Sequence, residues 1–256
     1  MKNNSPAAFN RRSPLFVSGF AFLSILALLV ASLRPILVNA QQDELQNSST
    51  VRFSENFDSV TAPQLPVGWT TAVTGATALP FATVTNRADT PPNSVYTNDP
   101  SIIGSSEIVS LPIRIGGNLP KLIFRHAYNT EGGFDGGVLE IKIGEGNFQD
   151  ILAAGSSFQT GAYREEPLSS EFGNPIGGRR AWTGLSAGSA TNPTFISTEI
   201  NLPVVAYRQM VQFRWRHGSD RVFAAEGASG WWIDTIQVTD NISGVNNNAI
   251  AIPSSG

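Results

Sequence analysis

Apolar and polar residues alternate along most of the chain between residues 51 and 240. In the segment 122–128, Leu122, Phe124 and His126 share one face. A period of two is typical of strands that bury one face. The alternation recurs in four further runs: Val51–Phe57, Leu139–Ile143, Val211–Trp215 and Trp232–Val238. Helical periodicity is hard to find, so the pattern predicts an all-β domain.

Clusters of Gly, Pro, Asn and Asp separate these runs, as in Asp89–Asn93 and Gly173–Pro175. About ten short antiparallel strands with such turns between them predict a jelly-roll β-sandwich. The segment 155–193 is too irregular for strands to be placed from the pattern.

The first forty residues have the organisation of an export signal. Lys2, Arg11 and Arg12 precede an apolar run at residues 15–33, and small residues end at Ala40. This order predicts a cleaved signal peptide at 1–40 and a secreted protein, with an uncleaved membrane anchor as the alternative. The rest divides into a polar lead-in (41–50), the sandwich domain (51–240) and a flexible tail (241–256).

The net charge limits the kinds of partner that the protein can bind, and the cysteine content limits how the fold can be stabilised. Residues 1–40 hold four of the 17 basic residues and none of the 20 acidic ones, so their removal lowers the formal charge from −3 to −7. That balance argues against nucleic acid or an anionic membrane as a partner after signal cleavage. The chain has no cysteine, hence no disulfides. A structural metal is therefore worth seeking as another source of stability.

The glycine-rich stretch NTEGGFDGGVLEIKIGEG, at 129–146, suggests three kinds of loop. A phosphate-binding loop requires a Gly-Lys-Ser/Thr sequence before a helix, and neither is present. An EF-hand loop requires oxygen ligands at alternating positions and a glutamate at the twelfth position. The residues that follow Asp135 do not supply them. The stretch therefore predicts a hairpin turn followed by a half-buried strand at 138–143.

Catalytic motifs are sparse. Gly184–Gly188 matches G-x-S-x-G around Ser186, but the Ser-Ala-Thr-Asn-Pro that follows cannot start the helix that a nucleophile elbow needs. The two histidines, His126 and His217, both lie in predicted strands beside large apolar residues. We expect them to be hydrogen-bonded core residues rather than ligands or bases.

Two carboxylates interrupt apolar faces. Glu55 has the parity of Phe53 and Phe57, and Asp234 has the parity of Trp232 and Ile236. A buried carboxylate is costly unless it is paired or binds a cation. Since the ends of a domain chain tend to be close, the first and last strands could bring both to one calcium site. Arginine partners are the alternative.

Several stretches resemble the choice-of-anchor J domains, secreted bacterial jelly rolls akin to MAM domains and to the C-terminal domain of immune inhibitor A peptidases. The stretches that carry this resemblance are FSENFDSVTAPQLPVGWT, FRHAYNTEGGFDGGVLEIKIGEGNFQDI, GRRAWTGLSAG, VQFRWRHGSD and GWWIDTIQV. The resemblance implies a non-catalytic, calcium-stabilised sandwich for adhesion or accessory binding. It implies calcium at Glu55, Asp58 and Asp234.

The expected function is extracellular binding, to a glycan or a cell-surface protein. Sugars stack on exposed aromatic faces, and among the five tryptophans Trp182, near Arg179, is expected to be exposed. The alternative is a secreted esterase or glycosidase that uses Ser186 or an unrecognised carboxylate pair.

Overall fold

A computed structural model describes residues 49–241 of the protein. The predicted signal peptide, most of the lead-in and the tail lie outside these residues. The described chain forms strands and one short 3-10 helix, η1 (Val204–Ala206), and contains no helix long and apolar enough to cross a membrane. The predicted all-β architecture is confirmed.

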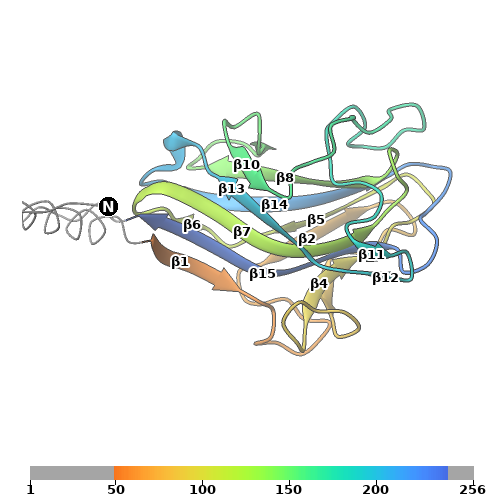
Figure 1. The fold of residues 1–256 in the computed structure, drawn as a ribbon, viewed down its shortest axis with the longest axis horizontal. Helices are drawn as coiled ribbons and strands as arrows, with labels where there is room; N and C mark the ends of the chain where they lie inside the picture. Colours follow the sequence, from red (N-terminus) through yellow and green to blue (C-terminus); the bar gives the residue numbers. More distant parts are fainter. Residues whose placement is uncertain (1–48, 242–256) are drawn as a thin grey trace, which may run out of the picture. The chain divides into compact units, whose positions relative to one another are not determined.

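The first sheet has seven strands, in the order β10-β13-β7-β15-β4-β3, with β1 also paired to β15 (Figure 1). Their bounds are β1 Ser49–Glu55, β3 Ala82–Val84, β4 Ser94–Thr97, β7 Asn118–Asn129, β10 Ser157–Thr160, β13 Ile196–Asn201 and β15 Gly230–Asn241. All pairs are antiparallel. The first strand, β1, pairs with the last strand, β15, as the sequence predicts.

The second sheet has six strands, in the order β2-β5-β14-β8-β9, with β6 also paired to β14. Their bounds are β2 Thr70–Thr74, β5 Gly104–Val109, β6 Ile113–Arg114, β8 Gly136–Ile143, β9 Gln149–Asp150 and β14 Met210–Ser219. A separate two-stranded ladder joins β11 (Gly188–Ser189) to β12 (Asn192–Pro193). Four of the fifteen described strands have only two residues, so the expectation of about ten strands agrees with the structure.

Aromatic side chains from both sheets meet in the core. Phe124 of β7 and Trp215 of β14 lie edge to face, with ring centroids 5.6 Å apart. The ring centroid of Trp231, from β15, lies 5.7 Å from that of Trp182. Offset and edge-to-face contacts of this kind stabilise a core beyond the area they bury. These contacts join the two sheets into one β-sandwich.

Trp182 is not exposed, so the prediction of an exposed sugar platform there is wrong. Its side chain is fully buried, and its Nε1 donates a hydrogen bond of 2.8 Å to the carbonyl of Gly161. The backbone of Trp182 also bridges to Gly137 at the start of β8. The irregular segment between β10 and β11 thus folds back against the sandwich and inserts its largest side chain.

Arg179 is likewise engaged within the fold. Its guanidinium donates to Glu140 at 2.6 Å and to Asp150 at 2.7 Å. Three quarters of the side chain is covered. The pair Arg179 and Trp182 therefore serves packing and ion pairing, and does not form an open ligand surface.

Gly137 lies where the inserted segment and both sheets meet. A Cβ at this position would lie 2.3 Å from the ring of Trp231. We expect Gly137→Ala to lower the free energy of unfolding by about 1–3 kcal/mol through overpacking, measured by urea denaturation. Gly132→Ala is the control, because its nearest neighbour would be 3.7 Å away. Equal stabilities of the two variants would contradict the described packing.

Candidate metal centre

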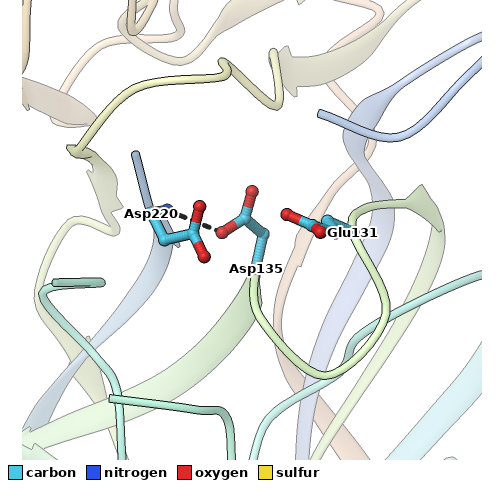
Figure 2. Close-up of side chains that lie close together, drawn as sticks. All are labelled: Glu131, Asp135 and Asp220. Atoms are coloured by element: carbon cyan, nitrogen blue, oxygen red, sulfur yellow. Dashed lines mark hydrogen bonds between the residues drawn. The ribbon is translucent and has the colours of Figure 1, made fainter. Parts of the chain in front are cut away.

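Four acidic residues from three separate connections meet at one end of the sandwich. Asp99 lies just after β4, and Asp220 lies just after β14. Glu131 and Asp135 both belong to the turn between β7 and β8. One carboxylate oxygen from each of Glu131, Asp135 and Asp220 lies within 4.8 Å of the others, as Figure 2 shows. Hydrogen bonds and electrostatic coupling connect Asp99 to this group. We call these four residues the carboxylate cluster.

Most of the carboxylate cluster is removed from solvent. Asp135 is completely buried, and Asp220 and Asp99 are 2% and 3% exposed. Glu131 is partly exposed at the rim. Burying several carboxylates close together is costly unless protons or cations compensate their charge.

Backbone amides satisfy part of the carboxylate cluster. Asp135 Oδ1 accepts from the amide of Asp220 at 2.6 Å. Asp99 Oδ2 accepts from the amides of Glu131 and Ala225 at 3.2 and 3.0 Å. These bonds tie the three connections together and fix where the carboxylates point.

Three further oxygens of the carboxylate cluster have no hydrogen-bond donor. Asp99 Oδ1, Glu131 Oε2 and Asp135 Oδ2 are buried and have no hydrogen bond. No arginine or lysine of residues 49–241 forms an ion pair with the carboxylate cluster. His217 Nε2 lies 3.2 Å from Asp99 Oδ1, but the two atoms are not aligned for a hydrogen bond. Buried polar atoms are nearly always satisfied, so this set points to a missing partner.

The carboxylates of the cluster also raise one another's pKa values. Burial, and then the charge of Asp99, raise the pKa of Asp135 to about 9. Burial, followed by the charges of Asp220 and Asp99, also raises the pKa of Glu131. A cation among these oxygens would reverse both effects, because a bound metal ion is the largest local charge in its site.

The donor set suits a hard cation. Carboxylate oxygens are the preferred ligands of calcium, which accepts six to eight oxygens in flexible geometry. Magnesium requires a tight octahedral shell, and zinc favours nitrogen and sulfur ligands. Ligands that come from three loops, with partial exposure at Glu131, match calcium best.

The residues predicted to bind calcium from the sequence are arranged differently. Asp234 accepts hydrogen bonds from the amides of Asp89, Thr90 and Thr235, at 2.8, 2.9 and 2.6 Å. Burial is the main cause that raises its pKa, to about 6. Backbone amides, rather than the arginines considered as the alternative, thus stabilise this carboxylate.

Glu55 and Asp58 are also bound to backbone amides. Glu55 Oε1 accepts from Phe57 at 2.7 Å, and Asp58 Oδ1 accepts from Asn93 at 2.9 Å. Among residues 49–241, the acidic side chains that lie close enough together to share a metal ion do not include Glu55, Asp58 or Asp234. Calcium at those three positions stays a prediction.

The sequence places Asp135 correctly in the connection before β8, but the predicted hairpin is wrong, because β7 and β8 belong to different sheets. The strand is also buried on both faces rather than half-buried. An EF-hand takes its ligands from one continuous loop, whereas the residues of the carboxylate cluster come from connections far apart in the chain. One local signal was available. Glu131 and Asp135 flank Gly132-Gly133, so the tight turn brings two carboxylates to the same side.

Ser186 has no catalytic partner within the described part of the chain. Its Oγ donates to the carbonyl of Thr194 at 2.9 Å and accepts from the amide of Tyr128 at 3.1 Å. No helix starts directly after Ser186, which lies in the irregular segment before β11 and is followed by that strand. The nucleophile-elbow alternative therefore has no structural support.

His126 is a buried structural residue, as predicted. Its Nδ1 accepts from Trp231 Nε1 at 3.1 Å, and its Nε2 lies 2.9 Å from Thr198 Oγ1. Burial lowers the pKa of His126 to about 3, so the ring is neutral. Both ring nitrogens are occupied, which leaves none for a metal or a substrate.

No protein-family model matches the chain, and no curated protein matches it. The choice-of-anchor J resemblance therefore stays an expectation.

Solved structures give distant matches. The K2 cleaved adhesin domain of Lys-gingipain is 19% identical, with 75% of this chain and 99% of that chain covered and a TM-score of 0.42. The K3 domain of the same protein, from Porphyromonas gingivalis, is 13% identical with a TM-score of 0.43 and coverages of 75% and 99%. The CBM22-1 xylan-binding domain of Paenibacillus barcinonensis Xyn10C is 11% identical with a TM-score of 0.40 and coverages of 77% and 97%. These similarities are too low to carry an argument about function.

Proposed function

We propose that this chain is a secreted, non-catalytic β-sandwich binding module, stabilised by a calcium ion at the carboxylate cluster. The observation that carries the proposal is the group of buried carboxylate oxygens without partners on Asp99, Glu131 and Asp135. The predicted signal peptide and the absence of cysteine are consistent with an exported domain stabilised by a metal instead of disulfides.

The same geometry does not support a glycosidase. The two catalytic carboxyl groups of such enzymes lie roughly 5–9.5 Å apart and flank the scissile bond of the sugar. One carboxylate oxygen from each of Glu131, Asp135 and Asp220 lies within 4.8 Å of the others, and Asp135 is fully buried. A sugar ring has no access between them, whereas a single ion does.

Calcium binding is tested directly by isothermal titration calorimetry on the protein without residues 1–40. We expect one binding event at the carboxylate cluster, and we expect Asp135→Asn to weaken it at least tenfold. The substitution keeps the shape and the Oδ1 acceptor, but removes the charge that a cation requires.

Asp234→Asn is the matched control. Its carboxylate is also buried, but three backbone amides already satisfy it. If Asp234→Asn abolishes binding and Asp135→Asn leaves it unchanged, the site predicted from the sequence is the right one and the carboxylate cluster is not. If the wild-type protein does not bind calcium at millimolar concentration, the proposal fails.

A further inference from the structure

A groove beside the carboxylate cluster has the properties of a ligand site. Its volume is about 490 Å³, within the usual range for small-ligand pockets. It is lined by Gly132, Gly133, Arg164, Glu165, Glu166, Thr183 and Gly184. They come from the β7–β8 turn and from the irregular segment between β10 and β11.

The glycines leave backbone uncovered. A Cβ on Gly133 would meet nothing within 4 Å, and Cβ atoms on Gly132 and Gly184 would meet only atoms 3.7 Å or more away. Most other glycines of the sandwich face neighbours closer than this. A ligand can therefore approach the main chain here, as glycine permits where a backbone must lie close to a ligand.

Two charged side chains at the groove have no ion-pair or hydrogen-bond partner among the described residues. Arg164 and Glu166 make no ion pair or side-chain hydrogen bond with any of residues 49–241. Glu165, which lies between them, is instead paired with Arg180. The free guanidinium offers only donors and the free carboxylate only acceptors, and their charges cancel.

These features identify a class of ligand. Sugar hydroxyls both donate and accept, so neighbouring hydroxyls can bind a guanidinium and a carboxylate together. Arg164 and Glu166 carry opposite charges and Glu165 is paired with Arg180, so the charged side chains at the groove balance one another, which favours a neutral saccharide over an anion. We infer that this groove is a binding subsite for a neutral saccharide. The inference rests on the proposed function as a binding module.

The groove is connected to the carboxylate cluster by the turn that they share. Gly133 donates to Thr183 Oγ1 at 2.8 Å, and Thr183 Oγ1 bonds the carbonyl of Glu131 at 3.2 Å. The side chains at both ends of the turn, Glu131 and Asp135, belong to the carboxylate cluster. A cation that fixes the turn also fixes one wall of the groove, so saccharide binding depends on calcium.

The test uses xylohexaose, cellohexaose and mannohexaose as probes, by isothermal titration calorimetry with 5 mM calcium or with chelator. We expect at least one to bind with calcium, and its Kd to rise at least threefold with chelator. Gly132→Gln should raise the Kd at least tenfold, because a Cβ at this position would meet no atom closer than 3.7 Å and the rest of the side chain would occupy the groove. Arg164→Ala should have a similar effect. Arg114→Ala, an exposed arginine on β6, is the matched control and should leave the Kd unchanged.

Several outcomes overturn this inference and leave the proposed function standing. One is that calcium still raises the melting temperature but no hexasaccharide binds at millimolar concentration. A second is unchanged sugar binding in both Gly132→Gln and Arg164→Ala, which places the sugar elsewhere. A third is binding of an unstructured peptide at the groove while no sugar binds. Sugar binding that is insensitive to chelator removes the connection to the carboxylate cluster.

Discussion

Trp182→Ala is expected to lower the free energy of unfolding by about 3–5 kcal/mol, the usual cost of truncating a buried aromatic side chain. The side chain is fully buried, and its ring contacts those of Phe124 and Tyr163 at centroid distances of 5.6 and 4.6 Å. The substitution leaves a cavity between the sheets and removes the hydrogen bond to Gly161. Urea denaturation monitored by circular dichroism measures the loss.

Phe223→Ala is the control for this prediction, since the ring of Phe223 is 64% exposed. Surface substitutions of this kind usually change stability by no more than about 0.5 kcal/mol. A loss at Trp182 no larger than at Phe223 would show that the segment between β10 and β11 is not part of the core.

Calcium is expected to raise the free energy of unfolding by about 2.7 kcal/mol when its free concentration is one hundred times the Kd. The folded chain assembles the carboxylate cluster from three connections, and the unfolded chain does not. For a domain of this size the increment corresponds to roughly 5–10 °C in melting temperature. Chelator should remove the gain, and calcium, rather than magnesium, should restore it.

Asp135→Asn should cancel most of this response, and Asp234→Asn should retain it. The sequence alone favoured the opposite order, because it placed Asp234 at the metal site and Asp135 in a turn. The reversal follows from the hydrogen bonds, which satisfy Asp234 and leave Asp135 Oδ2 without a partner. Identical melting curves with chelator and with millimolar calcium would exclude a stabilising ion at either place.

The pH dependence gives a further expected result. Burial and the charge of Asp99 raise the folded pKa of Asp135 well above its unfolded value of about 4, so without metal the folded state keeps a proton that the unfolded state releases. The metal-free protein should therefore lose stability as the pH rises above about 4. The calcium increment should grow over the same range, since the ion binds the deprotonated form. Melting curves at pH 5 and 8, with and without calcium, measure both trends. A calcium increment that is larger at pH 5 would contradict them.

The sequence by itself determined the class of fold. Alternation at 122–128 and 211–215 indicates extended segments with a buried face, and these become part of β7 and β14. The segment 139–143 is also extended, in β8, but both faces of this strand are buried between residues 136 and 141. The same parity identified Asp234 as a buried carboxylate and His126 as a core residue, and both are fully buried. These properties depend on the local period of the chain, so a single sequence carries them.

Only the tertiary structure decided where the unpaired carboxylates meet and where Trp182 lies. Asp99, Asp135 and Asp220 converge because β4, β7 and β14 end at the same end of the sandwich. This arrangement follows from the strand order across two sheets. Trp182 is buried because an irregular segment with no period bridges to Gly137. Contacts between residues distant in the chain leave no local pattern in the sequence. The entropy lost by closing the long loops between them, and the free energy gained when they pack, both depend on how the sheets are assembled.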